Sequence, residues 1–575
     1  MSITLHGLGI GGGIAIGHAH LVSQADIEIV HYQIPPEAIA SEVTRFEDAI
    51  RSTRKELEML WGSIPENAPT ELGAFLSLHI MLLNDHTLSK DPIQLIQTQK
   101  CNAEWALQQQ LDVLLAQFDE IEEEYLRERR TDVIQVTERI FKTLAGHEPI
   151  FHAPHCGGDD CILVAHDLSP TDMVLFKDTN YRAFITDVGG VTSHTAILAR
   201  SLDLPSVLAL RHAREMIREQ ELIIVDGING VVIIDPDETI LAEYRLRQGE
   251  WQLKQNALQD IRTSQAVTLD GTTVELFANI ELPEDCDLAL ENSASGIGLF
   301  RSEFLFLKED DLPTEEEQFI AYKAVAESMQ GRAVIIRTVD LGKDKIPSWQ
   351  SESEAPNPAL GLTGIRLCMA EPQMFRTQLR ALLRASAYGN IKLLLPMLST
   401  ISEVKQTRAH LDEVMADLRA NGIAFDEQIE LGGMIEVPAA AMAVGSFLNH
   451  LDFVSIGTND LIQYSLAVDR NDDAVSHLYD PLNPGVLQLL HHVISTANRL
   501  GKPVSMCGEM AGDPSLSRLL LGLGLRRFSM LPIQLLKVKQ LILSAEMDYI
   551  KPIVAKMLDA EDSDRLRELL QELNR

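Results

Sequence analysis

The sequence predicts a multidomain α/β protein, in which an α/β domain is interrupted by a helical bundle and is followed by a C-terminal TIM (β/α)8 barrel. Three observations support this prediction. The chain has 575 residues, well beyond the ~250 to 300 at which a single hydrophobic core stops growing. A Gly-rich, β-like opening gives way abruptly to helical periodicity. From about residue 265, strand-like and helix-like segments alternate to the end of the chain.

The amino-acid composition limits the classes of protein that are compatible with the sequence. Hydrophobic residues make up 45% and charged residues 23%, as in ordinary globular proteins. With 49 basic and 84 acidic residues the formal net charge is −35, which disfavours nucleic acid and anionic membranes as partners. No apolar run is long enough for a transmembrane helix, and the opening lacks a signal peptide's basic region. The six scattered cysteines suggest a reducing compartment, so we expect a cytoplasmic protein.

The first α/β domain is expected to comprise residues 1–25 and 147–235. Short β runs return after Gly146: CILVA at 161, RAFITD at 182, SVLAL at 206, ELIIVDG at 221 and VVIID at 231. Between the two parts, residues 26–146 show the apolar spacing of amphipathic helices, for example at Val43, Phe46 and Ile50. This spacing predicts an inserted helical bundle. Residues 236–264 are polar and helix-prone, which predicts a helical linker.

Residues 265–575 carry eight predicted strands separated by helical patterns, the repeat of a TIM barrel. The predicted strands are VELFANI at 274, GIGLF at 296, AVIIR at 333, IKLLLPM at 391, GGMIEV at 432, DFVSIG at 452, PVSMCG at 503 and RRFSM at 526.

Polar side chains gather at the predicted C-terminal ends of these strands, where the βα loops of a TIM barrel meet. Arginines suit phosphate and carboxylate oxygens, and paired carboxylates suit Mg²⁺. A single arginine of this kind is usually a surface ion pair, but a whole set at strand ends predicts one pocket for a small phosphorylated acid and Mg²⁺. The set is Asn279, Arg301, Arg337, Glu436, Asn459, Asp460 and Cys507, with Arg470 and His477 slightly further on.

Cys507 has two readings. A free cysteine is most often a small buried apolar residue. At a strand end facing a cationic pocket, its thiol is instead a candidate for carrying a proton to or from the substrate. The position of Cys507 in the string SMCGEMAG favours the second reading.

His194 is the candidate nucleophile. The string FITDVGGVTSHTAILARSLDLPSV at 184–207 reads as a strand, a Gly-Gly turn and a capped helix, with His194 in the first helical turn. Exposed backbone N–H groups and the helix dipole favour an anion there. Most histidines have no such role, but the glycines and neighbouring hydroxyls make a phosphoryl group on His194 a specific expectation.

Long motifs then give a resemblance over essentially the whole chain. They are GGVTSHTAILARSLDLP, GLFRSEFLF at 298, VIIRTVDLG at 334, GGMIEVPAA at 432, DFVSIGTNDLIQYSLAVDRND at 452 and MCGEMAGD at 506. Together with the N-terminal GIGGGIAIG and the helical LHIMLLND at 78, they resemble enzyme I of the bacterial phosphoenolpyruvate-dependent sugar phosphotransferase system.

The resemblance implies a phosphoenolpyruvate-protein phosphotransferase with a swivelling phosphohistidine domain. His194 would take the phosphoryl group from phosphoenolpyruvate, with release of pyruvate, and pass it to a histidine of the carrier protein HPr. The helical insert would dock HPr, and the barrel would provide the contact of a homodimer. Because His194 and the barrel mouth belong to different domains, transfer to the carrier requires the histidine domain to swing.

The resemblance also implies roles for the barrel residues. Arg301, Arg337 and Arg470 would hold the substrate's phosphate and carboxylate. Glu436 and Asp460 would bind Mg²⁺, with Asn459 beside them touching the phosphate. Cys507 would protonate the enolate carbon.

Two positions depart from the family pattern. The family's LGxRxIR string reads LGLTGIR here, with Thr363 where an arginine is usual. Its DxGGDK string reads DLGKDK, with Lys343 where a glycine is common. One phosphate contact is therefore missing, unless Arg366 or Lys343 supplies the charge.

Three alternative functions fit the sequence to different extents. Pyruvate phosphate dikinase and phosphoenolpyruvate synthase share the histidine domain and the barrel, but they need an ATP-grasp domain for which the chain has no room. A nitrogen-regulatory paralogue of enzyme I usually adds an N-terminal sensory domain that this sequence does not show. A catalytically weakened protein that acts by binding carriers is favoured only by Thr363.

We predict that Thr363→Arg lowers the Michaelis constant for phosphoenolpyruvate, because a guanidinium restores a charged fork for the phosphate. Steady-state kinetics of the two proteins measure this. Equal Michaelis constants would contradict the prediction.

Overall fold

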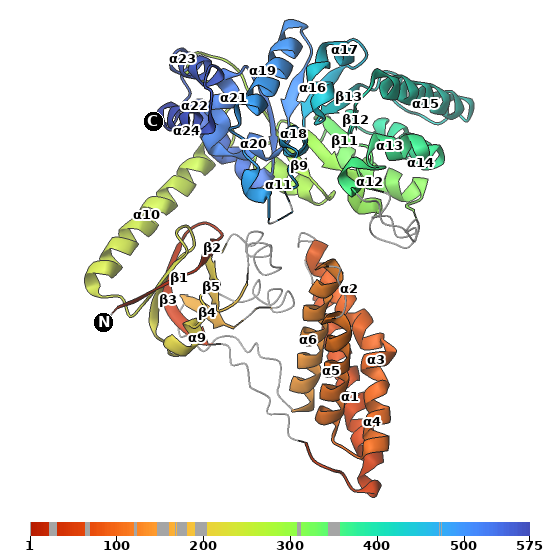
Figure 1. Cartoon of the computed structure of the whole chain (residues 1–575), viewed down its shortest axis with the longest axis vertical. Coiled ribbons are helices and arrows are strands. Elements are labelled where there is room, and N and C mark those ends of the chain that lie inside the picture. Colours follow the sequence, from red (N-terminus) through yellow and green to blue (C-terminus); the bar gives the residue numbers. More distant parts are fainter. Residues whose placement is uncertain are drawn as a thin grey trace. The chain divides into compact units, whose positions relative to one another are not determined.

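A computed structural model of the chain describes residues 2–21, 31–63, 70–119, 124–145, 160–166, 168, 181–189, 204–306, 312–342, 357–470, 472 and 474–575. The chain divides into two compact units, residues 1–255 and 256–575 (Figure 1). Among the described residues, no helix combines the length and the hydrophobicity needed to cross a membrane.

The first unit contains a mixed eight-stranded sheet in the order β1-β8-β7-β3-β4-β5-β6-β2. Strands β3 to β6 pair in parallel and the remaining pairs are antiparallel. The strand bounds are β1 Ile3–His6, β2 Leu8–Ile10, β3 Ile14–Leu21, β4 Cys161–Ala165, β5 Tyr181–Thr186, β6 Ser206–Leu208, β7 Leu222–Asp226 and β8 Val231–Ile234. All five β runs predicted after Gly146 are therefore strands.

Central strands of this sheet, such as β4, are buried on both faces. In β4, Leu163 packs into one apolar cluster, while its neighbours Ile162 and Val164 pack into another. Side chains of successive strand residues point to opposite faces, so a strand buried on both sides reads as a continuous apolar run. This explains why CILVA carries no polar residue.

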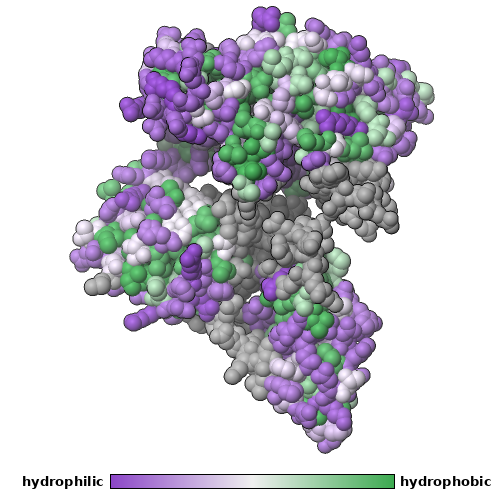
Figure 2. Space-filling model, viewed as in Figure 1, coloured by the Kyte–Doolittle hydropathy of each residue, from purple (hydrophilic) through white to green (hydrophobic). Residues whose placement is uncertain are grey.

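Among the described residues, six α-helices lie between β3 and β4 in the sequence, a short one lies between β6 and β7, and one follows β8. The inserted helices are α1 Ile39–Ser63, α2 Thr70–Asn84, α3 His86–Ser89, α4 Asp91–Gln99, α5 Ala103–Asp119 and α6 Glu124–Leu144. The apolar stripe predicted in the first of them is its buried face, since Phe46, Ile50 and Leu57 are all buried. The visible outer surface of the inserted helices is mostly hydrophilic (Figure 2), as expected of amphipathic helices. The later helices are α9 Ala213–Met216 and α10 Glu238–Asp260.

Helix α10 is fastened to the glycine-rich turn before β3. Gln248 Nε2 donates to the carbonyl oxygen of Ile14 at 2.8 Å. A Cβ on Gly13, which has φ +116°, would lie 3.2 Å from the Trp251 ring. The turn needs glycine because its backbone is left-handed and the indole lies directly against it. The boundary between the two units falls within α10, after Gln255.

The second unit is a closed barrel of eight parallel strands, β9 to β16, which confirms the predicted TIM barrel (Figure 1). Every strand predicted from the sequence is present. The bounds are β9 Glu275–Ile280, β10 Ile297–Arg301, β11 Val334–Arg337, β12 Ile391–Leu395, β13 Leu431–Ile435, β14 Phe453–Ile456, β15 Val504–Met506 and β16 Arg527–Met530.

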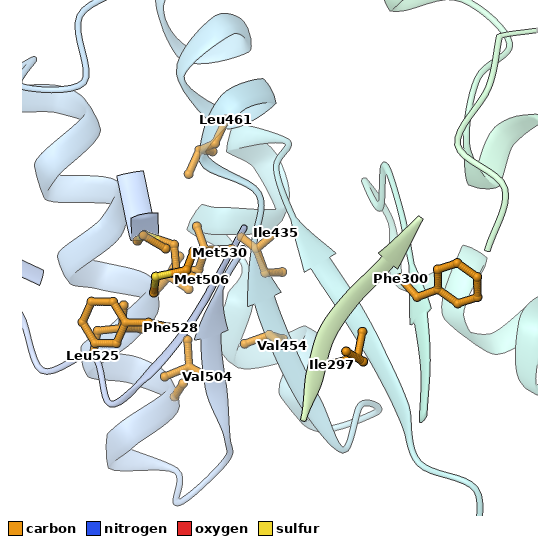
Figure 3. Close-up of a cluster of buried hydrophobic side chains, with 14 of the residues drawn as sticks. Ile297, Phe300, Ile435, Val454, Leu461, Val504, Met506, Leu525, Phe528 and Met530 are labelled. Carbon is orange, nitrogen blue, oxygen red and sulfur yellow. The ribbon is translucent and has the colours of Figure 1, made fainter. Parts of the chain in front are cut away.

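Helices surround the barrel and bury its outer face. They are α11 Asp285–Glu291, α12 Glu315–Ser328, α13 Ile365–Ala370, α14 Pro372–Ser386, α15 Ile401–Ala420, α16 Pro438–Met442, α17 Val444–Leu448, α18 Thr458–Leu466, α19 Pro484–Arg499, α20 Glu509–Gly512, α21 Ser517–Gly522, α22 Leu535–Leu543, α23 Met547–Leu558 and α24 Ser563–Leu573. Figure 3 shows part of the hydrophobic cluster that includes strand and helix side chains. Met506 and Phe528 lie close together there, and their strands pair at these two residues.

The inside of the barrel is filled by a separate small cluster of side chains. Its members are Leu299, Ile335, Leu394, Met434, Phe453 and Cys507. Phe453 has room because Gly432 has no side chain, since a Cβ there would lie 2.3 Å from the aromatic ring. The interior is thus a packed core with Cys507 in its upper layer.

The cysteines only partly match the expectation of reduced thiols. Cys101, Cys286, Cys368 and Cys507 are free and buried. Cys161, in contrast, is disulfide-bonded.

We predict that Gly432→Ala lowers the free energy of unfolding of the barrel by about 1 to 3 kcal/mol, because the added methyl group forces Phe453 out of its position. Urea unfolding followed by circular dichroism measures this. Gly445→Ala is the matched control, since its Cβ would make only an ordinary 3.6 Å contact with Thr496. Equal stability of the two variants would contradict the prediction.

Candidate functional site

The predicted barrel residues lie at one rim, because the C-terminal ends of parallel strands in a closed barrel point the same way. Arg301 ends β10, Arg337 ends β11, Glu436 follows β13 and Cys507 follows β15. Asp460 lies in the first turn of α18, directly after β14. Their charges act on one another, since both arginines influence the titration of Asp460 and of Cys507.

Arg337 is the buried cation of this rim. Its Nη2 pairs with Glu303 at 2.9 Å and its Nη1 pairs with Asp340 at 2.7 Å. Burial disfavours the charge, but Glu303 and Asp340 outweigh burial and raise the pKa of Arg337 above its ordinary value. The guanidinium therefore stays charged and is held in a fixed orientation.

Glu436 is a buried carboxylate that forms a single hydrogen bond with the described residues. It is 1% exposed, and its Oε1 accepts a hydrogen bond from the backbone N–H of Met397 at 2.5 Å. No described residue forms a hydrogen bond with its Oε2. Burial, followed by the charges of Asp340 and Asp460, raises the pKa of Glu436 well above its ordinary value. Such an oxygen is costly to bury unless a cation or donor meets it.

Other buried polar atoms of this rim also lack a hydrogen-bond partner within the described parts of the chain, namely Glu303 Oε2, Arg337 Nε, Thr338 Oγ1 and Thr458 Oγ1. Buried polar atoms are normally hydrogen-bonded. Several such atoms at one end of the barrel therefore indicate a site where a polar ligand forms the missing hydrogen bonds.

The carboxylates suit a hard divalent cation. Glu436 offers its unpartnered oxygen, and burial and the charge of Asp340 both raise the pKa of nearby Asp460. Within the part of the chain that the structure describes, no three His, Cys, Asp or Glu side chains surround a common point. Carboxylate oxygens are the ligands that hard divalent cations prefer.

A pocket of about 430 Å³ opens beside these residues and is lined by Arg470, Ser476, Tyr479 and Glu509. The Arg470 side chain lowers the pKa of Asp460, opposing the effect of burial, so its charge reaches the rim. Burial, with the charge of Glu509, raises the pKa of Tyr479 to about 12. The phenol is therefore a neutral hydrogen-bond donor at neutral pH.

Asn459 and Glu509 join the starts of α18 and α20. Asn459 Nδ2 donates to Glu509 Oε1 at 2.8 Å, and the backbone N–H of Glu509 donates to Asn459 Oδ1 at 2.9 Å. The Asn459 amide is thus fixed beside Asp460. Its orientation is set by Glu509.

Cys507 is a buried thiol, 4% exposed. Burial raises its pKa, whereas the Ser455 hydroxyl and the charge of Arg337 lower it. The net shift is upward, so the group is a thiol at neutral pH. A protonated thiol among cations can give a proton to a substrate.

Arg301, Arg470 and His477 are the more exposed members of the predicted set. Arg301 pairs with Glu281, and both side chains are substantially exposed. His477 is exposed in the short turn Ser476–Leu478. His194 and Lys343 lie outside the described residues.

The loop that carries Thr363 is anchored from two sides. Arg366 Nη1 donates to the carbonyl oxygens of Leu360 and Gly361 at 3.2 and 3.5 Å. Tyr464 donates to the carbonyl oxygen of Ala359 at 2.7 Å. Arg366 is thus engaged with the loop itself, and this argues against its supplying the missing phosphate contact.

Sequence reasoning missed Glu303 and Asp340. Both lie within motifs that were recognised, two residues after Arg301 and three after Arg337. The sequence signal that could have identified them is the position of each carboxylate, two or three residues after an expected phosphate-binding arginine. Their pairing with Arg337 depends on strands β10 and β11 being neighbours.

Three parts of the chain match domains of phosphoenolpyruvate-utilising enzymes. Residues 6–129 match the N-terminal domain, residues 157–230 the mobile domain, and residues 255–547 the phosphoenolpyruvate-binding domain. The barrel and its polar rim fall in the last of these. The class of protein is therefore a phosphoenolpyruvate-utilising enzyme.

Relatives named phosphoenolpyruvate-protein phosphotransferase cover almost the entire chain. The one from Cupriavidus necator is 50% identical over 585 residues, covering 100% of both chains. Those from Listeria monocytogenes and Bacillus subtilis are 39% identical over 571 residues and 42% identical over 531 residues, covering 99% and 92% of both chains. The chain belongs to the phosphoenolpyruvate-protein phosphotransferases, the enzyme I family, and it is an enzyme of phosphoenolpyruvate-dependent phosphotransfer, which confirms the resemblance read from its motifs.

We predict that Glu436→Gln stabilises the metal-free protein by about 1 kcal/mol near neutral pH, because it removes a buried charge that faces two other carboxylates. The folded-state pKa of Glu436 is raised, so the wild type loses stability as pH rises above the ordinary carboxyl pKa of about 4.3. The difference between the variant and the wild type should therefore shrink as pH falls toward that value. Urea unfolding in a chelator at about pH 5 and about pH 7.5 measures it.

Glu430→Gln is the control for this experiment, because the Glu430 carboxylate pairs with Lys392 at 2.8 Å instead of facing like charges. It should give no gain in stability. A Glu436→Gln protein no more stable than the wild type near neutral pH would contradict the prediction.

Proposed function

We propose that the enzyme transfers the phosphoryl group of phosphoenolpyruvate to His194, releases pyruvate, and then passes the group to a histidine of an HPr-like carrier, the first step of sugar uptake by the phosphotransferase system. The observation that carries this proposal is the convergence of three arginines, two carboxylates and a protonated thiol at one end of the barrel. Phosphoryl transfer needs charge neutralisation around the phosphoryl oxygens more than it needs covalent chemistry from the binding site.

The substrate is held by Arg301, Arg337 and Arg470, with Asn459 touching the phosphate. Arg337 is already oriented by Glu303 and Asp340 at 2.9 and 2.7 Å, so little rearrangement is needed when an anion arrives. Arg337 Nε and Thr458 Oγ1 have no hydrogen-bond partner among the described residues, so they are available to substrate oxygens.

In the chemical step a neutral imidazole nitrogen of His194 attacks phosphorus, and the bond from phosphorus to the enol oxygen breaks. The electrons of that bond leave as pyruvate enolate. The Cys507 thiol gives its proton to the terminal carbon of the enolate, which yields pyruvate. The resulting thiolate regains a proton from solvent before the next turnover.

Glu436 and Asp460 are the residues that would hold Mg²⁺, which when bound neutralises phosphate charge and stabilises the enolate. The unpartnered Glu436 Oε2 and the raised pKa of both carboxyls support this assignment. Without a cation, these side chains repel one another.

The other parts of the chain have proposed roles that rest on the family. Residues 1–25 with 147–235 form the swivelling phosphohistidine domain, and residues 26–146 dock the carrier. Residues 236–264 link this part to the barrel of residues 265–575, through which the enzyme forms a homodimer. We place this reaction in the cytoplasm.

Labelled phosphoenolpyruvate tests the proposal. With Mg²⁺, the wild type should acquire acid-labile, alkali-stable phosphate, release pyruvate, and label an HPr-like carrier. His194→Ala should abolish labelling, whereas His212→Ala, an exposed histidine beside Glu215 in the same unit, should label normally.

Two results would count against the proposal. An unlabelled wild type would favour a weakened or nitrogen-regulatory paralogue that acts by binding carriers. Undiminished labelling of His194→Ala would mean that another side chain is the nucleophile.

A further inference from the structure

Asn279 is a buried amide, 9% exposed, in the first strand of the barrel. Its Nδ2 donates to the carbonyl oxygen of Cys507 at 2.9 Å and to that of Ser529 at 3.3 Å. Its Oδ1 accepts a hydrogen bond from Ser529 Oγ at 2.5 Å. Both amide hydrogens and the amide oxygen are therefore engaged with the protein, which leaves Asn279 poorly suited to bind substrate directly.

Ser529 determines which way this amide faces. Its hydroxyl is fully buried and donates to the amide oxygen, so the NH₂ group must face the two carbonyl oxygens. The hydroxyl has room because Gly298 has no side chain, since a Cβ there would lie 2.3 Å from Ser529 Oγ. Residues of β10, β16 and β9 thus fix one hydrogen-bonding group beside Cys507.

The backbone of Cys507 is held on both sides. Its N–H donates to the carbonyl oxygen of Ile456 in β14 at 3.1 Å, and its own carbonyl oxygen accepts from Asn279. Cys507 directly follows β15, and the next residue, Gly508, opens the turn into α20. The hydrogen bond from Asn279 therefore holds Cys507 at the position where the backbone hydrogen bonds of β15 end.

We propose that Asn279, oriented by Ser529, is a positioning residue that holds the Cys507 thiol in line for proton transfer. This inference rests on the proposed role of Cys507 as proton donor to the enolate. Proton transfer to carbon requires close and aligned donor and acceptor, and a displacement of about 1 Å can cost about 100-fold in rate. Asn279 acts on the second half of the reaction, the formation of pyruvate, and contributes little to substrate affinity.

Kinetics of Asn279→Ala test this assignment. The turnover number should fall about 10- to 100-fold, while the Michaelis constant for phosphoenolpyruvate stays within about twofold, because the arginines are untouched. Ser529→Ala, which removes only the orienting hydroxyl, should give a smaller loss and serves if Asn279→Ala does not fold. Asn498→Ala is the matched control, since Asn498 donates the same kind of bond to the carbonyl oxygen of Gly524 at 3.0 Å, and it should keep full turnover.

A second readout separates positioning from a general effect on the fold. In a Cys507→Ala background, adding Asn279→Ala should change the residual turnover less than about twofold, because the residue through which Asn279 acts is already missing. The alkylation rate of Cys507 by iodoacetamide should change in Asn279→Ala and stay the same in Asn498→Ala.

The outcomes distinguish this inference from the function on which it rests. Full turnover of Asn279→Ala combined with an impaired Cys507→Ala overturns the positioning role alone. An equal loss in the wild-type and Cys507→Ala backgrounds also overturns it, since Asn279 would then support only the fold. Full turnover of Cys507→Ala overturns the proton-donor role and, with it, this inference.

Discussion

The buried pairing of Arg337 with two carboxylates is the interaction on which the barrel rim depends. Glu303 and Asp340 hold the guanidinium at 2.9 and 2.7 Å. Nearby, one oxygen of Glu436 accepts no hydrogen bond from the described residues. A surface site with the same residues would be screened by water and would gain little from the arrangement. Because the packed interior of the barrel supports the rim from below, the charged side chains of the rim stay oriented.

The rest of the barrel serves to keep that rim rigid. Leu299, Leu394 and Phe453 fill the interior below it, and the helices bury the outside of the strands. Most of the rim side chains therefore lie at strand ends or in first helical turns, where the barrel fixes the backbone, whereas Arg470 lies beyond the end of α18. Repulsion among the carboxylates is tolerated there because the surrounding core is large and well packed.

The first unit has a different physical character. Central strands of its sheet are buried on both faces, and α10 is fastened to the sheet by Gln248 and Trp251. At the other end of this linker, Lys539 Nζ donates to the carbonyl oxygen of Arg262 at 2.6 Å. The boundary between the two units lies between these attachments.

The sequence by itself determined the strands, the amphipathic helices and the rim residues, because apolar periodicity and the strand-end rule of the TIM barrel are local or topological properties. It also revealed Thr363 as a departure. Only the tertiary structure decided that Glu303 and Asp340 share Arg337, that Arg366 is engaged with its own loop, and that Asn279 bonds to Cys507. Asn279 and Cys507 are distant in sequence and meet only because β16 closes the barrel onto β9. Such contacts depend on which strands become neighbours, and no local pattern encodes that.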